Sequence, residues 1–269
     1  MQHLKNRSSW GKRCWMIGLL FALVGSCTDE RRSSQGGALT IATAASMAPV
    51  MEEIAAAFQD STGIAVELIK GASGQLANQI LNGAPIDVFL SADTSYPGLL
   101  QRAGFANRRL RVFAEGSLWL WTSHAPGEDL AKWLQSPQVS RIALANIERA
   151  PYGRAAWQYL ESAKLAESLQ TKLVFGESIA QVNLYIREKA VDAAFVPASS
   201  RIVLRETRGM WTQIPRSTHS RLQHSLVTIE QNPKKSRTAP EKFLKFLSSS
   251  PSYILLKKYG YHLPEKKPK

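Results

Sequence analysis

The chain has 269 residues, 44% of them hydrophobic, and a formal net charge of +13. This length and apolar content indicate a soluble, globular protein that can bury the core of one large domain or of two smaller ones. The positive charge is spread along the chain and partly gathered in C-terminal lysines, with no basic stripe interleaved with aromatic residues. That distribution argues against nucleic-acid binding.

The N-terminus has the pattern of an export signal. Residues 1–26 carry four cations and no acid, followed by an apolar stretch too short to span a membrane comfortably. The segment ends in Val24, Gly25, Ser26 and Cys27, which resembles a bacterial lipobox, so we expect an acylated Cys27 at the mature N-terminus. A chance cysteine near an ordinary signal-peptidase site is the alternative. Removing residues 1–26 leaves 30 basic and 21 acidic residues, a net charge of +9.

A first series of elements follows a polar, glycine-containing tether at residues 27–38. Short apolar runs alternate with amphipathic stretches, which predicts a parallel sheet flanked by helices. The expected strands are residues 39–44, 64–70, 87–91 and 110–113, and the expected helices are residues 49–60, 75–82 and 94–102.

A second series begins at the apolar run of residues 118–122. The expected strands are residues 118–122, 141–145, 173–175 and 193–196, the helices are residues 129–134, 152–163 and 180–189, and a closing strand at 225–229 precedes helices at 240–247 and 251–259. Two α/β units are the simplest interpretation. If the closing elements return to the first unit, lobe 1 comprises residues 39–117 plus 225–269 and lobe 2 comprises residues 118–224. The two chain crossings would then form a hinge.

Two serines stand where helices are expected to begin. Ser46 follows the first strand and is predicted to cap the next helix, with Pro49 in the first turn, where a missing N–H costs nothing. Ser73 follows the second strand in the same way. Both would lie at the carboxyl end of one sheet, where free helix amides can bind an anion. For either serine alone, an ordinary helix cap is the preferred interpretation.

Other polar residues give weaker signals. The histidines show no H-E-x-x-H or zinc-finger spacing, so no metal cation is expected, and His219 and His224 are predicted to lie at the surface. Trp119 and Trp121 alternate with leucines and should pack in a core or interface rather than stack on a ligand. No G-x-S-x-G motif surrounds a serine, so a serine hydrolase remains an alternative that no motif supports.

Three segments together carry a family resemblance: residues 44–58, residues 71–77 and, above all, residues 83–93. With weaker matches at residues 150–153, 177–181 and 193–196, the chain from Leu39 to about Tyr261 resembles the molybdate-binding proteins of ABC transporters. These periplasmic or lipid-anchored receptors deliver an oxyanion to an inner-membrane permease.

The resemblance implies an α/β, two-lobed periplasmic-binding-protein fold of type II, in which each lobe is a mixed or parallel sheet flanked by helices and the ligand lies in the cleft between the lobes. It implies that Ser46 and Ser73 donate hydroxyl and backbone hydrogen bonds, and that Tyr152 and Ile179 donate through their backbone. Pro197 stands where many members have a tyrosine. The ligand would be molybdate or tungstate, bound without a cofactor or metal cation by a monomeric, periplasmic protein that meets its permease at the membrane.

The residues themselves support an oxyanion ligand. Hydroxyls and helix N-terminal amides can hold a dianion without a buried cation, and a site of donors alone rejects a protonated phosphate. Sulfate remains an alternative, because a changed site around Pro197 could suit a smaller anion. The same architecture also serves in regulators, but the sequence shows no attached DNA-binding or membrane-spanning module.

Overall fold

The computed structural model describes residues 38–106, 110–230 and 237–264. The predicted signal at residues 1–26, the predicted lipobox cysteine Cys27 and nearly all of the predicted tether at residues 27–38 lie outside the described residues. All described residues belong to one compact unit, Gly36–Lys269. None of the described helices is both long and apolar enough to cross a lipid bilayer.

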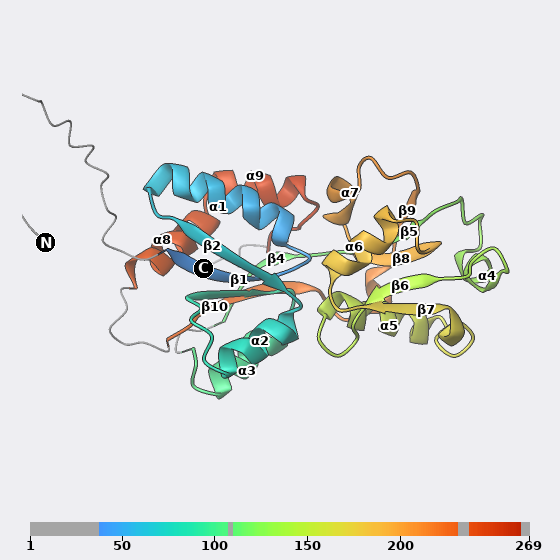
Figure 1. The fold of residues 1–269 in the computed structure, drawn as a ribbon, viewed down its shortest axis with the longest axis horizontal. Coiled ribbons are helices and arrows are strands. Elements are labelled where there is room, and N and C mark those ends of the chain that lie inside the picture. The colour runs from blue at the N-terminus through green and yellow to red at the C-terminus, as the bar shows by residue number, and fades with distance from the viewer. Residues whose placement is uncertain (1–37, 107–109, 231–236, 265–269) are drawn as a thin grey trace, which may run out of the picture. The chain divides into compact units, whose positions relative to one another are not determined.

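The first sheet has five strands in the order β2-β1-β3-β10-β4 (Figure 1). Strands β1, β2 and β3 are parallel, whereas β10 runs antiparallel to both of its neighbours, β3 and β4. The strands are β1 (Leu39–Ala44), β2 (Val66–Gly71), β3 (Val88–Ser91), β4 (Arg111–Glu115) and β10 (Gln223–Thr228).

Helices cover both faces of this sheet (Figure 1). One face packs against α1 (Ala48–Thr62), α8 (Thr238–Leu247) and α9 (Ser250–Lys258), and the other against α2 (Ser73–Leu81) and α3 (Ser95–Arg102). Adjacent residues of β1 divide between the two faces, since Ile41 belongs to the first apolar cluster and Ala42 to the second. This is the two-residue period of a strand.

Helix α1 shows how the sequence pattern positions its element. Val50, Met51, Ile54 and Phe58 recur at helical spacing and are all buried. The ring of Phe58 packs edge-on against Phe243 of α8, with centroids 5.4 Å apart. The apolar stripe of the helix is therefore what attaches it to the sheet.

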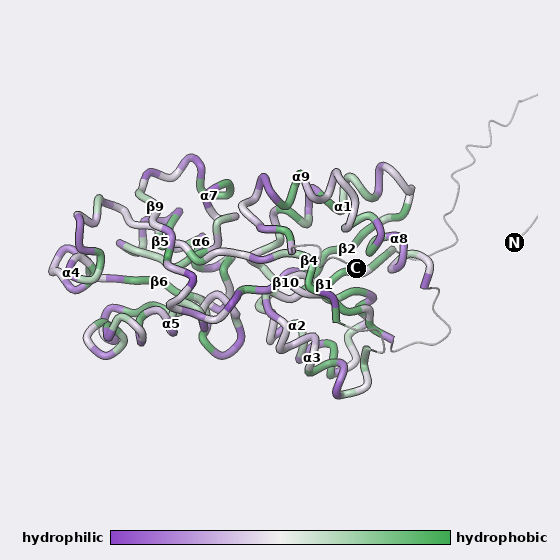
Figure 2. The backbone as a smooth tube through the Cα atoms, turned by 180° about the vertical axis from the view of Figure 1, so that it is seen from behind, coloured by the Kyte–Doolittle hydropathy of each residue, from purple (hydrophilic) through white to green (hydrophobic). Residues whose placement is uncertain are grey.

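The second sheet also has five strands, in the order β7-β6-β8-β5-β9. Strands β6, β7 and β8 are parallel, and β5 is antiparallel to β8 and β9. The strands are β5 (Leu118–Thr122), β6 (Ile142–Ala145), β7 (Leu173–Gly176), β8 (Ala193–Pro197) and β9 (Met210–Gln213). Figure 2 shows strands such as β6 as largely hydrophobic, whereas exposed loops include the most hydrophilic stretches.

Four α-helices accompany this sheet, with α5 and α6 on opposite faces (Figure 1). They are α4 (Leu130–Gln135), α5 (Pro151–Ser162), α6 (Ile179–Arg187) and α7 (Ser200–Val203), and short 3-10 turns occupy Gln170–Lys172 and Arg216–Thr218.

The two connections between the sheets lie against each other. The amide of Gly116, between β4 and β5, donates to the carbonyl of Leu222, just before β10, at 2.9 Å. Glu115 pairs through its backbone with His262 and through its carboxylate with Arg216 and Arg221. The hydrogen bond from Arg221, with the charge of Arg216, lowers the pKa of Glu115 below its usual range, despite partial burial. The crossings and the C-terminal segment are thus joined at one point.

The α/β class and the two-sheet architecture predicted from the sequence are confirmed, with element ends shifted by one to a few residues. Both sheets are mixed, as the family resemblance implied: β1–β3 and β6–β8 pair parallel, as the alternating pattern predicted, whereas β4, β5, β9 and β10 pair antiparallel. The sequence pattern did not predict α7 or β9, which have only four residues each.

Candidate functional site

Six of the described helices follow parallel strands: α3 follows β3, α7 follows β8, and four others carry or adjoin the predicted site residues. In the first sheet α1 follows β1 and α2 follows β2, and in the second α5 follows β6 and α6 follows β7. Neighbouring parallel strands end at the same edge of a sheet, and the first amides of a helix have no intrahelical partner. Each sheet therefore presents three helix N-termini at one edge, with their positive dipole ends, although α7 has only four residues.

The two edges contact each other. The amide of Gly74 donates to the carbonyl of Arg149 at 2.9 Å, and the hydroxyl of Tyr96 donates to the carbonyl of Glu148 at 2.5 Å. These hydrogen bonds link the starts of α2 and α3 to the loop before α5. The apolar core continues across the junction, since one buried cluster includes Ala44, Ala72 and Ala92 at the first edge and Ala145, Ala150 and Ile179 at the second.

Ser46 lies in this junction but does not cap α1. The helix begins at Ala48 with Met47 at the N-cap, so the predicted cap is wrong. The carbonyl of Ser46 accepts two hydrogen bonds of 2.7 Å, from the hydroxyls of Ser199 and Tyr261. Its Oγ is buried and has no hydrogen-bond partner among the described residues. The backbone of Ser46 is therefore held by two hydrogen bonds, while its hydroxyl uses none of its hydrogen-bonding capacity among the described residues.

Ser73 is the first residue of α2, two residues earlier than the predicted helix start. Its side chain is buried, and its Oγ accepts a hydrogen bond of 3.1 Å from the amide of Ala92, which follows β3. Because a hydroxyl both donates and accepts, this contact orients Oγ and leaves its proton for another acceptor.

Tyr152 and Ile179 stand in the first turns of α5 and α6. The first amide bonds into these turns come from Arg154, to the carbonyl of Ala150, and from Gln181, to the carbonyl of Ser178. The amides of Tyr152 and Ile179 precede them in the chain and are orphan donors of the kind that every helix start provides. Both residues are buried, with 1% and 3% of their surface exposed.

The side chain of Tyr152 belongs to a buried cluster that the sequence did not reveal. Its hydroxyl lies 3.2 Å from Nε2 of His224, whose ring contacts the edge of Tyr261 at a centroid distance of 5.0 Å. The prediction that His224 lies at the surface is wrong, because β10 is an inner strand and both tyrosines cover it. Burial lowers the pKa of His224 to about 3, so the imidazole is neutral.

The charged groups near the junction are engaged with one another. Arg154 lies 3.6 Å from the carboxylate of Asp93 and contacts the hydroxyl of Tyr96, and the Arg149 side chain lies 3.6 Å from Glu177. Among the described residues, no group of three or more histidine, cysteine, aspartate and glutamate side chains is arranged to hold a metal ion. Donors at the junction that no carboxylate engages thus include the hydroxyls of Ser46 and Ser73.

Pro197 is the last residue of β8, and buried hydroxyls follow it. Ser199 holds the carbonyl of Ser46, and Oγ of Ser200 is buried without a partner among the described residues. Serines directly after a predicted strand were a signal that could have identified both. Tyr261 had no local signal, because only the tertiary fold brings it to Ser46.

Comparison with known proteins identifies the family. Residues 39–262 match the family model described as bacterial extracellular solute-binding protein. A molybdate-binding protein (ModA) of Rhodobacter capsulatus is 30% identical over 226 residues, which are 84% of this chain and 88% of the relative. The ModA of Azotobacter vinelandii is 31% identical over 238 residues, 86% of this chain and 92% of the relative.

A solved structure is also similar. The periplasmic molybdate-binding protein of Azotobacter vinelandii superposes with a TM-score of 0.77 at 29% identity, over 84% of this chain and 100% of that one. The residues that match the family model include both sheets and the starts of α1, α2, α5 and α6. The chain belongs to the bacterial extracellular solute-binding proteins.

Proposed function

We propose that this chain captures molybdate, or the nearly equal-sized tungstate, between its two sheets and delivers it to an ABC permease. The observation that carries the proposal is the contact between the two sheet edges that bear the starts of α1, α2, α5 and α6, beside which Oγ of Ser46 is buried without a partner among the described residues. The similarity to two molybdate-binding proteins supports the choice of anion.

The charge of the proposed site suits a dianion. Each helix N-terminus acts as roughly half a positive charge, so four of them offset about two negative charges without a buried cation. The proposed donors are the hydroxyls of Ser46 and Ser73 and the amides of Tyr152 and Ile179. Their burial strengthens every hydrogen bond to the anion, because little water competes.

The proposed site also discriminates by protonation. A protonated phosphate needs an acceptor for its O–H, and burying that group unpaired is costly. The carbonyl of Ser46 already accepts hydrogen bonds from Ser199 and Tyr261, which leaves it poorly placed to accept a third. A fully deprotonated oxyanion is therefore favoured. Sulfate, which is smaller, remains the alternative ligand.

Domain organisation follows from the same proposal. Lobe 1 comprises residues 39–117 plus 225–269 and lobe 2 comprises residues 118–224, with the joined crossings at Gly116 and Leu222 as the hinge. The hydrogen bond between Arg154 and Tyr96 links the lobes. It would form as the monomer closes on its ligand. Residues 1–26 would be removed and an acylated Cys27 would anchor the protein in the periplasm through the tether at residues 27–38.

The site supports binding rather than catalysis. A serine hydrolase of the Ser-His-Asp type needs a histidine beside its nucleophile. Oγ of Ser73 contacts the amide of Ala92, and Nε2 of His224 contacts Tyr152 rather than a serine. We therefore propose a binding protein and not an enzyme.

Isothermal titration calorimetry against molybdate, tungstate, sulfate and phosphate tests the proposal. Molybdate and tungstate should bind with one site per chain and at least tenfold more tightly than sulfate, and phosphate should not bind. If sulfate binds more tightly than molybdate, sulfate is the ligand. If none of these anions binds, the proposed function is refuted.

A further inference from the structure

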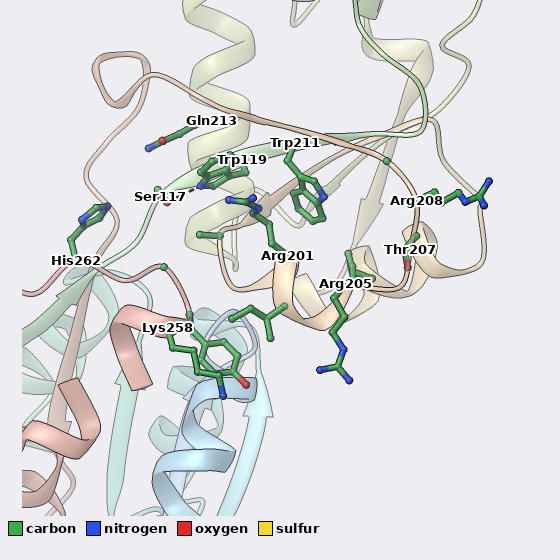
Figure 3. Close-up of a pocket in the computed structure, with 16 residues that line it drawn as sticks. Ser117, Trp119, Arg201, Arg205, Thr207, Arg208, Trp211, Gln213, Lys258 and His262 are labelled. Carbon is green, nitrogen blue, oxygen red and sulfur yellow. Dashed lines mark hydrogen bonds between the residues drawn. The ribbon is translucent and has the colours of Figure 1, made fainter. Parts of the chain in front are cut away.

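A second recess lies outside the proposed oxyanion site. It has a volume of about 720 Å³ and is formed by residues of β5, α7, β9 and the loop between α7 and β9, together with the end of α9 and the segment after it (Figure 3). We call this recess the Arg201 groove. Its volume lies in the range of pockets that hold small organic ligands, about 300–1,000 Å³.

The groove is positively charged. Arg201, Arg205, Arg208 and Lys258 line it, and none of its lining residues is acidic. Lys258 is engaged by Glu53 at 2.9 Å and Arg205 lies 3.7 Å from Glu206. Within the described ranges, the ion pairs include neither Arg201 nor Arg208. The unneutralised charge of the groove is therefore concentrated on these two arginines.

The central arginine, Arg201, packs against the ring of Trp119. The guanidinium carbon of Arg201 lies 4.8 Å from the ring centroid of Trp119, and Nε1 of this indole donates to Oγ of Ser117 at 2.9 Å. Figure 3 shows Arg201 reaching from α7 toward Trp119 and Trp211, whereas Arg205 and Arg208 extend outward. A guanidinium stacked by its face keeps its N–H edge for a carboxylate or phosphate.

Trp119 therefore differs from Trp121, its neighbour but one in β5. Trp121 is buried in the core, as expected, but Trp119 is only half-buried and forms a wall of the groove. Two indole rings next to an unpaired arginine can receive both parts of an amphiphilic anion: a flat apolar body and a charged head.

We propose that the Arg201 groove binds a small organic anion with a planar, unsaturated body and a carboxylate or phosphate head. Arg201 holds the head in a two-pronged hydrogen bond, and Trp119 and Trp211 contact the body. The recessed shape favours a small molecule over a flat lipid surface. This inference goes beyond the proposed oxyanion function and does not depend on it, since the groove shares none of Ser46, Ser73, Tyr152 or Ile179.

Titration of the purified protein with phenyl phosphate tests this inference, with inorganic phosphate in a parallel titration. Saturating molybdate is present throughout so that an anion site at the junction is filled, and the Ser73→Ala variant repeats the titration without molybdate. Phenyl phosphate should bind at least tenfold more tightly than phosphate in both cases. It should also shift the indole Nε1–H resonances of Trp119 and Trp211 in the unmodified protein.

The variant Arg201→Glu should weaken phenyl phosphate binding at least tenfold, and Arg201→Lys should weaken it severalfold because lysine lacks the planar fork. The matched control is Arg102→Glu, which makes the same charge change at an exposed arginine of α3 and should leave the affinity within twofold. Circular dichroism checks that each variant is folded. If Arg201→Glu does not fold, the indole resonances of the unmodified protein provide the test.

Three results would overturn the inference. Phenyl phosphate fails to bind or to shift the two indole resonances, it binds no better than phosphate, or Arg102→Glu weakens it as much as Arg201→Glu. Vesicles containing phosphatidylglycerol provide the last comparison. If they retain the protein through Arg201 while phenyl phosphate does not bind, the groove is a lipid contact and not a small-molecule site.

Discussion

Ser46→Ala should separate ligand binding from folding. Oγ of Ser46 is buried and forms no hydrogen bond with a described residue, and the backbone of Ser46 is held instead through its carbonyl. Removing Oγ thus breaks no hydrogen bond of the described fold, and the free energy of unfolding of the unliganded protein should change by less than about 1 kcal/mol. A lost hydroxyl bond to a charged acceptor costs about 1.5–3 kcal/mol, or roughly tenfold to a hundredfold in affinity for molybdate.

Calorimetric titration measures the affinity, and urea unfolding without ligand measures the stability. Thr228→Val is the matched control, because Thr228 Oγ1 is also buried without a partner among the described residues. Thr228 pairs with Val88 at the start of β3, whereas the proposed site lies beyond the carboxyl end of the parallel strands. Thr228→Val should bind molybdate like the parent protein. Parental affinity in Ser46→Ala, or equal losses of affinity in both variants, would refute the reasoning.

Three further predictions use the same two assays. Ser73→Ala should lower both affinity, by about 1.5–3 kcal/mol, and stability, by about 1–3 kcal/mol, because the buried amide of Ala92 loses its acceptor; unchanged stability would contradict this role. Tyr261→Phe should weaken molybdate binding severalfold, because the carbonyl of Ser46 keeps only one of its two donors; parental affinity would show that Ser199 suffices. Burial lowers the pKa of His224 to about 3, whereas an unfolded histidine titrates near 6.5, so the unfolded state takes up the proton first and stability falls as the pH drops from 7 toward 3. Between pH 7.5 and pH 5 the loss attributable to this group is about 2 kcal/mol, and His224→Gln should abolish that part of the pH dependence in urea unfolding.

Periodicity was sufficient to predict most of the fold. The apolar stripe of α1 and the strand that precedes it were predicted correctly because both patterns arise from local geometry. The predicted cap failed for a local reason as well. The amide of Met47 bonds to the carbonyl of Ala44 at 2.8 Å and forms a tight turn, which delays the helix until Ala48.

The features that the sequence did not reveal depend on contacts between distant residues. His224 is buried because Tyr152, 72 residues earlier, and Tyr261 cover it. Tyr261 reaches the carbonyl of Ser46 across 215 residues of chain, and no local pattern predicts that contact. Trp119 alternates with buried leucines like a core residue, but its ring lines the Arg201 groove. Its neighbour there is Arg201, which is 82 residues later in the chain and which no local pattern pairs with it.

A crystal structure with bound molybdate tests the central proposal most directly. The anion should lie at the junction of the two sheets, with Oγ of Ser46, Oγ of Ser73 and the amides of Tyr152 and Ile179 each about 2.6–3.2 Å from its oxygens, and without a contacting lysine or arginine side chain. Molybdate held instead by a cationic side chain, or located anywhere but between these four residues, would contradict the account.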